Sequence, residues 1–149
     1  MSKTPGRTQR LHFFAERAAS LAIVDLPGYG FARVSKQERA RFAVAVERYL
    51  RERTLLCGLV LILDVRRAPQ EDEEMLAEFG ASRGIGLVCV ATKVDKLGHG
   101  ERARRLRELE RGALGPWLPF SAVSGEGREA LAQAIVHLAC GQMEKAGKV

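Results

Sequence analysis

Apolar residues along the chain follow two periodicities that alternate. Short uninterrupted apolar runs indicate buried strands, whereas apolar residues three or four positions apart indicate helices with one buried face. Strands are expected over residues 11–16, 21–24, 58–64, 87–91 and 117–120. Helices are expected over residues 35–53, from residue 69 to about residue 79, and over 100–111 and 128–140.

The connections between these elements predict the fold class. The short polar connection over residues 17–20 favours an antiparallel hairpin of the first two strands. From residue 58 onward, strands and helices alternate through short connections, which predicts right-handed crossovers and a mainly parallel sheet. The unbroken apolar run 59–63 is typical of a strand covered on both faces. We therefore expect an α/β fold with helices on both faces of the sheet.

Helix starts and inner faces can also be predicted. Ser35 with Glu38 forms a capping-box pattern, and Pro69 followed by four acidic residues marks a second start. The residues expected to face the core are Phe42, Val46, Tyr49, Leu50, Met75, Leu76, Phe79, Ala103, Leu106, Leu109, Leu131, Ile135 and Leu138.

Composition limits the class of protein. With 149 residues, 46% apolar and 28% charged, the chain fits one soluble domain. We place this domain at residues 1–140 and a flexible tail at 141–149. No apolar run is long enough to span a bilayer and no signal peptide is recognisable, so no membrane partner and a cytoplasmic location are expected. Cys57, Cys89 and Cys140 lack metal-ligand spacing and are interpreted as reduced, buried thiols.

The net charge of +6 favours a polyanionic partner. Residues 33–53 carry seven basic and three acidic side chains, which suits either a solvated helix face or a surface that faces RNA. The sequence leaves these alternatives open, and nothing in it predicts DNA binding.

The first chemically informative segment is Asp25-Leu26-Pro27-Gly28, at the end of an apolar strand. A carboxylate there can hold magnesium through water, and a glycine amide can approach a terminal phosphate. Taken alone, the segment is equally well explained as a turn that ends the strand.

The second segment, Thr92-Lys93-Val94-Asp95, also follows an apolar strand. A carboxylate at the mouth of a parallel sheet can accept two N–H bonds from the edge of guanine, while the lysine stem lies along the base. Adenine offers no such donor pair and would leave the carboxylate unpaired, so strong discrimination is possible. An exposed loop with ordinary charges is the alternative.

The third segment is Phe120-Ser121-Ala122, after the last strand. Small residues there allow backbone N–H groups to reach a carbonyl oxygen such as guanine O6. Alone, it could simply lead into the next helix.

The order of the three segments and their surrounding residues resemble a known family. Ser-Lys-Thr-Pro-Gly-Arg-Thr-Gln at 2–9, Asp-Leu-Pro-Gly-Tyr-Gly at 25–30 and Thr-Lys-Val-Asp-Lys at 92–96 closely resemble the EngB family. These are the YihA/YsxC-type bacterial GTPases of the Era and septin-like group. The resemblance extends from Ser2 to about Cys140.

This resemblance implies a Ras-like P-loop GTPase fold, magnesium-dependent GTP binding and hydrolysis, assembly of the large ribosomal subunit, and a link to cell division and septation. It implies that Thr8 and Asp25 are magnesium ligands. The guanine-nucleotide site that it implies comprises Gly6, Arg7, Thr8, Gln9, Asp25, Leu26, Pro27, Gly28, Thr92, Lys93, Val94, Asp95, Phe120, Ser121 and Ala122.

Two departures qualify this expectation. The family's first strand, its Gly-x-x-x-x-Gly-Lys-Ser phosphate loop and its first helix have no counterpart among these residues. We therefore expect an N-terminally truncated chain, with Met1 an internal start and impaired nucleotide binding. Tyr29 follows the glycine of the second switch, where Ras-like enzymes carry a water-orienting glutamine, so no catalytic base is nominated. A nonenzymatic, basic module that binds the ribosome or RNA without nucleotide is the alternative function.

Overall fold

The chain forms two compact units, Met1–Leu56 and Cys57–Val149. The computed structural model describes residues 12–16, 21–26, 44 and 46–146. The two segments predicted to contact the guanine base, residues 92–95 and 120–122, lie in the second unit and within the described part.

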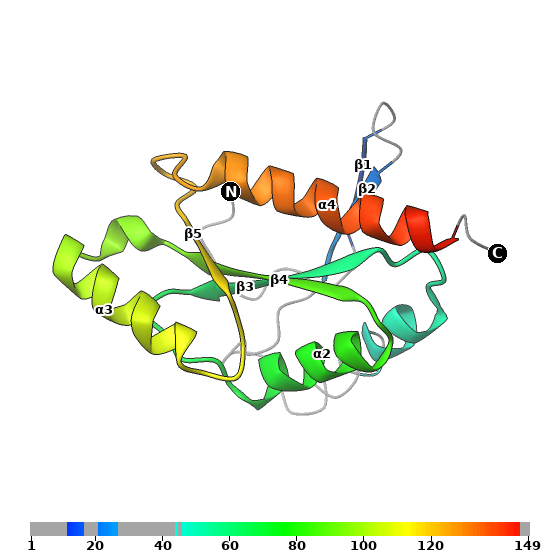
Figure 1. Ribbon diagram of the computed structural model, residues 1–149, viewed down its shortest axis with the longest axis horizontal. Coiled ribbons are helices and arrows are strands. Elements are labelled where there is room, and N and C mark those ends of the chain that lie inside the picture. Colours follow the sequence, from blue (N-terminus) through cyan, green and yellow to red (C-terminus); the bar gives the residue numbers. More distant parts are fainter. Residues whose placement is uncertain (1–11, 17–20, 27–43, 45, 147–149) are drawn as a thin grey trace. The chain divides into compact units, whose positions relative to one another are not determined.

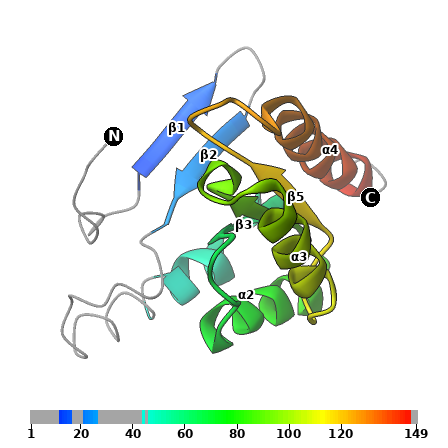
Figure 2. The same cartoon turned by 90° about the vertical axis from the view of Figure 1, so that its left-hand side faces the viewer.

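The described strands of the first unit form an antiparallel hairpin. Strand β1 (His12–Glu16) pairs with β2 (Leu21–Asp25), with His12 opposite Asp25 and Glu16 opposite Leu21. Figure 2 shows these two strands in blue. The predicted hairpin is confirmed, and the register places Asp25 at the end of its strand.

Residues 46–52 of the first unit are helical, as expected for the end of the predicted helix. Val46 and Leu50 are buried, in agreement with the predicted inner face. The Arg53 guanidinium lies over the rings of Phe13 and Tyr49, at 5.7 and 5.4 Å from their centroids. Ser35, Glu38 and Phe42 lie outside the described residues.

Two arginines of this helical segment are neutralised locally. Arg48 forms an ion pair with Glu52 at 2.9 Å, and Arg51 forms one with Glu47 at 2.5 Å, each four residues apart. Such pairs are typical of a solvated helix surface. For the described part of residues 33–53, the solvated-face interpretation is therefore favoured.

The second unit contains a parallel three-stranded sheet in the order β3-β4-β5. Its strands are β3 (Gly58–Asp64), β4 (Gly86–Thr92) and β5 (Trp117–Phe120). Asp64 lies opposite Thr92, and Thr92 lies opposite Phe120. The prediction of a parallel sheet is confirmed here, and all three strands end in one row.

Helices cover both faces of this sheet, as predicted. Helix α4 (Arg128–Ala146) lies on one face, while α2 (Glu71–Ser82) and α3 (His99–Glu110) lie on the other (Figure 1). Helix α4 continues to Ala146, six residues beyond the predicted end at Cys140.

The core lies between the sheet and the pair α2 and α3. Alternate residues of β3 and β4 point into it, because successive strand side chains face opposite sides. The buried members of this cluster are Leu61, Leu63, Val65, Cys89, Ala91, Val94, Leu109, Leu114 and Trp117.

The opposite face of the sheet meets α4 closely at the start of two strands. A Cβ atom added at Gly58 would lie 2.7 Å from Leu138, and one added at Gly86 would overlap the same side chain. The absence of side chains at these two positions therefore lets Leu138 approach the strand backbones.

Two predictions about α2 were wrong. Helix α2 begins at Glu71 with Gln70 as its N-cap, and the Glu73 carboxylate accepts the Gln70 backbone N–H at 2.8 Å. Met75 is 60% exposed rather than facing the core. Leu76, which was predicted to face the core, and Ala77 pack against the core cluster. Gly80 is buried, and a Cβ atom added there would lie 3.1 Å from Leu59 of β3.

Burial was also expected of all three cysteines, and it holds only for Cys89. Cys57 is half-buried and Cys140 is exposed. In the described part of the chain, no helix is long and apolar enough to cross a membrane.

Replacing Leu63 by alanine should destabilise the second unit by about 2–5 kcal/mol, because Leu63 is 1% exposed and its removal leaves a cavity. The neighbouring Ile62 is 66% exposed, so Ile62→Ala should cost about 1 kcal/mol or less. Urea unfolding followed by fluorescence of Trp117, the only tryptophan, measures both. Equal losses from the two variants would contradict this assignment of the core.

Candidate guanine-nucleotide site

The polar groups that follow β3, β4 and β5 gather at one edge of the sheet. Because the three parallel strands end in register at Asp64, Thr92 and Phe120, their following loops start side by side. The sequence predicted this meeting for the last two loops. The structure adds Asp64, at the end of β3, to this group of polar residues.

Asp95 and Ser121 form the closest link between the predicted guanine loops. The Ser121 hydroxyl donates a hydrogen bond of 2.7 Å to Oδ1 of Asp95. The same hydroxyl oxygen accepts the backbone N–H groups of Val123 and Ser124, each at 3.2 Å. Ser121 is fully buried, and its hydroxyl is held in one orientation with its O–H directed at the Asp95 carboxylate.

The Asp95 carboxylate is held in its charged form. Its pKa lies below the usual range because Ser121 donates to it, and Lys96 lies 3.4 Å from Oδ2 and contributes in the same direction. A charged carboxylate is an acceptor only. It can therefore receive paired N–H donors from a ligand, and it offers nothing to a ligand edge made of acceptors.

Lys93 has the left-handed backbone conformation, with φ of 61°. Its Nζ lies 3.1 Å from Oδ2 of Asp64 at the end of the neighbouring strand. This ion pair joins the loops after β3 and β4. Asp64 was not among the predicted site residues.

Asp64 is also bound by Arg66. The Arg66 Nε and Nη2 atoms lie 2.9 and 2.7 Å from Oδ1 and Oδ2, and the Arg66 backbone N–H donates to Oδ1 at 3.1 Å. Hydrogen bonds from Arg66, with a further contribution from Lys93, hold the pKa of Asp64 well below its usual range. The position of Asp64 at the end of an apolar strand, like that of Asp25, is the sequence signal that could have identified it.

The other predicted residues of the segments 92–95 and 120–122 differ in their burial and contacts. The Thr92 hydroxyl donates to the Leu63 carbonyl at 3.0 Å, and Val94 is buried in the core at 1% exposure. Phe120 is half-buried and Ala122 is exposed. Burial of Val94 between Lys93 and Asp95 anchors the segment that carries both charged side chains.

The predicted phosphate and metal segments lie in the first unit. Asp25 and Leu26 are described, with Asp25 exposed at the end of β2. Gly6, Arg7, Thr8, Gln9, Pro27 and Gly28 lie outside the described residues. The predicted pairing of Thr8 with Asp25 therefore stays a prediction.

A magnesium ion takes oxygen ligands and is usually held by one or two carboxylates together with water and substrate phosphates. Asp25 has the right chemistry for such a site. Within the described ranges, no group of three His, Cys, Asp or Glu side chains forms a metal cluster.

The loop after β5 closes tightly before α4. The Ser121 N–H donates to the Glu126 carbonyl at 3.0 Å, and the Gly125 N–H donates to the Ser121 carbonyl at 2.9 Å. Gly127 has φ of 76°, and a Cβ atom there would overlap the carbonyl oxygen of Pro119.

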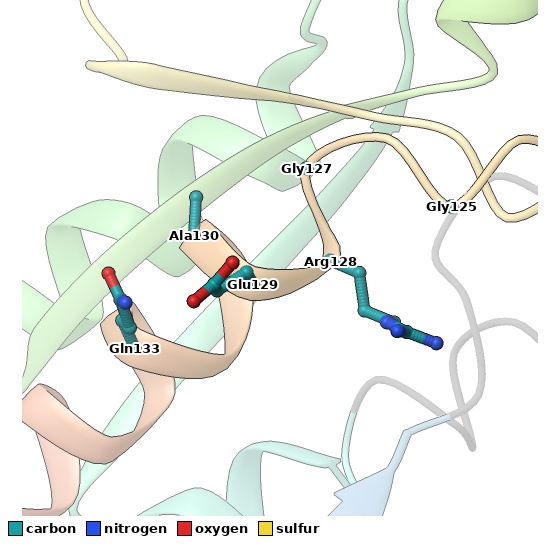
Figure 3. Close-up of a pocket in the computed structure, with 6 residues that line it drawn as sticks. All are labelled: Gly125, Gly127, Arg128, Glu129, Ala130 and Gln133. Carbon is teal, nitrogen blue, oxygen red and sulfur yellow. The ribbon is translucent and has the colours of Figure 1, made fainter.

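An open recess lies at the first turn of α4. Its lining consists of Gly125, Gly127, Arg128, Glu129, Ala130 and Gln133. Arg128 points away from Glu129 and Gln133 (Figure 3). The recess shares Gly125 with the loop after β5 and contains none of the predicted site residues.

Comparison with known proteins identifies the family. The chain is 45% identical over 150 residues to a probable GTP-binding protein EngB of Anaeromyxobacter dehalogenans strain 2CP-C, covering 93% of this chain and 69% of that protein. The chain belongs to the EngB family. A probable GTP-binding protein EngB of Gemmatimonas aurantiaca is 39% identical, with the same coverage of 93% and 69%.

The fold agrees with this membership. The crystal structure of a probable GTP-binding protein engB superposes with a TM-score of 0.70 at 21% identity, covering 93% of this chain and 84% of that one. No family model matches the chain. The resemblance to EngB and the predicted Ras-like α/β fold are thus confirmed.

Two glycine substitutions separate backbone strain from steric overlap in the loop of this EngB-family chain. Gly125→Ala should cost about 1 kcal/mol, because φ is 78° but nothing lies within 4 Å of the added Cβ. Gly127→Ala should cost more than about 2 kcal/mol, because the Cβ also meets Pro119. Urea unfolding of each variant gives the comparison, and a smaller loss for Gly127→Ala would refute the tight closure.

Asp64→Asn should reduce stability at pH 7 by about 1 kcal/mol, since both cationic partners are about half exposed and the ion pairs are screened. A folded-state pKa below the ordinary value means that ionised Asp64 stabilises the fold above about pH 4 and that this is lost as pH falls toward the folded pKa. The variant should therefore lose less stability than the wild type on acidification from pH 5 to pH 3.

Urea unfolding at each pH measures this difference. Glu78→Gln, at an exposed position of α2, is the control for effects of low pH on stability that do not depend on Asp64. Parallel pH profiles for wild type and Asp64→Asn would show that the Asp64 ion pairs do not stabilise the fold.

Proposed function

We propose that this chain is a guanine-nucleotide-binding protein of the EngB type, and that the intact protein hydrolyses GTP. The observation that carries the proposal is the Asp95 carboxylate, held by the buried Ser121 hydroxyl at the aligned ends of β4 and β5. The relatives of this chain, which are named as probable GTP-binding proteins, support the same ligand.

Guanine suits this carboxylate better than any other common base. Its N1–H and N2–H groups form two parallel donors, which an ionised carboxylate can accept together. Adenine presents an acceptor at N1, so the carboxylate would lose its hydration without gaining partners. Lys93, tied to Asp64, would lie along the base, and the exposed Ala122 beside Ser121 leaves room for backbone N–H groups to reach O6.

The phosphates and magnesium would be held by the first unit. We assign the phosphates to residues 6–9 and 25–28, and magnesium to Thr8 and Asp25. When bound, magnesium neutralises charge that develops on the phosphates. The 149 residues contain no Gly-Lys-Ser or Gly-Lys-Thr, so we propose that this polypeptide binds nucleotide weakly.

For the cellular role, we propose cytoplasmic action in assembly of the large ribosomal subunit, with the associated link to cell division and septation. The excess of positive charge supports a partner rich in phosphate.

A nonenzymatic RNA-binding module is the second candidate. Arg107 and Arg111 at the end of α3 are exposed, and neither has an ion-pair partner among the described residues. Binding to ribosomal RNA without guanine nucleotide, with affinity that falls steeply as salt increases, would favour this candidate. Binding that is absent or insensitive to salt would exclude it.

Titration with fluorescent GDP in magnesium tests the main proposal. The 149-residue chain should bind GDP with micromolar or weaker affinity, because its sequence contains no lysine-containing phosphate loop to hold the phosphates. Competition with unlabelled GDP, XDP and ADP gives the base preference, and GDP should compete best.

Asp95→Asn should change that preference by about a hundredfold in favour of XDP, because an amide can donate to the 2-carbonyl oxygen of xanthine. Asp72→Asn, the same substitution on α2, is the matched control and should leave the preference for GDP unchanged. Submicromolar binding of GDP would refute the proposed weakness, and an unchanged preference in Asp95→Asn would refute the base site.

A further inference from the structure

A second polar link joins the loop after β5 to α3. The Arg102 guanidinium forms two hydrogen bonds to the Glu126 carboxylate, of which the contact from Nη1 to Oε2 measures 2.9 Å. The two residues are 24 positions apart. Arg102 is in the first turns of α3, and Glu126 is two residues before the start of α4.

This ion pair acts on the same loop as the bond between Ser121 and Asp95. The backbone carbonyl of Glu126 accepts the N–H of Ser121, so the side chain and the carbonyl of one residue connect α3 to Ser121. The loop is therefore attached to the segment 94–102 twice, through Ser121 to Asp95 at one end and through Glu126 to Arg102 at the other.

Burial and charge agree with an ordered contact. The Arg102 side chain is only 26% exposed, which is low for an arginine on a helix surface, whereas Arg104 in the same helix is 64% exposed. The Glu126 carboxylate has a lowered pKa because Arg102 donates to it. The planar guanidinium fixes direction as well as distance, because it binds both carboxylate oxygens.

We infer that Arg102 and Glu126 are positioning residues that hold the Ser121 loop where its hydroxyl can orient Asp95 for guanine. The inference rests on the proposed guanine site. Neither residue touches the base in this arrangement. Their effect passes through the Glu126 backbone to Ser121 and from the Ser121 hydroxyl to Asp95.

Hydrogen exchange of the folded, nucleotide-free chain tests the positioning directly. Glu126→Gln and Arg102→Gln should each speed exchange of the Ser121 and Gly125 amides by about threefold to fivefold, the range expected for loss of a partly exposed ion pair. The charge-reversed pair Arg102→Glu with Glu126→Arg should restore slow exchange. Glu52→Gln breaks the exposed ion pair with Arg48 in the first unit and should leave both amides unchanged.

Titration with GMP, followed by the backbone amide signals of Asp95 and Ser121, tests the consequence for the base. GMP carries the base with a single phosphate, so the comparison depends little on the phosphate loop. Affinity for GMP should fall about threefold in Glu126→Gln and recover in the charge-reversed pair. AMP is the control ligand and should shift neither signal.

The outcomes separate this inference from the proposed function. Unchanged exchange in Glu126→Gln, or faster exchange with unchanged GMP affinity, would overturn the positioning role. If wild-type chain gives no GMP-dependent shifts while exchange responds to Glu126→Gln, the proposed function fails, and the ion pair stabilises the loop without a role in base binding. If Glu126→Gln does not fold, Glu126→Asp and Arg102→Lys, which keep the charges but change the geometry, replace the Gln variants and should show smaller changes in the same direction.

Discussion

The packing of the parallel sheet against α2 and α3 is the constraint on which the rest of the second unit depends. Leu61 and Leu63 of β3 and Cys89 and Ala91 of β4 point into one buried layer. A shift of one residue in any strand would turn these side chains out of the core. The register is thereby fixed, and with it the row of strand ends from which every polar loop of the site begins.

The two aspartates at this edge of the sheet, Asp64 and Asp95, differ in their partners. Asp64 is bound by two cations, Arg66 and Lys93. Asp95 is oriented by the neutral Ser121 hydroxyl and has one more distant cation, Lys96 at 3.4 Å, so it keeps acceptor capacity. A carboxylate in the first setting organises its neighbours, and one in the second setting can serve a ligand. Two aspartates that look alike in the sequence, each near the end of an apolar strand, thus differ because of their partners.

Much of the fold could be predicted from periodicity, because the apolar runs mark β3 to β5 and the alternation with helices implies parallel crossovers. Coverage of β3 on both faces was predicted wrongly at Ile62, which is 66% exposed. The meeting of Asp95 with Ser121 also follows from strand order. The rotation of α2 could not be predicted, since Met75 and Leu76 are both apolar and neighbouring, and their spacing does not show that Leu76 packs on the core while Met75 is exposed. Ion pairs such as that between Arg66 and Asp64 depend on side-chain geometry, which cannot be inferred from the spacing of residues in the sequence.

Gly58 and Gly86 determine where α4 is packed most closely on the sheet of the second unit. Leu138 sits over the starts of β3 and β4, where neither strand has a side chain, and this fastens α4 to the end of the sheet opposite the site. Ile62, near the far end of β3, remains largely uncovered. Leu138 therefore joins α4 to the sheet at the strand starts, away from the carboxyl ends that carry the polar loops.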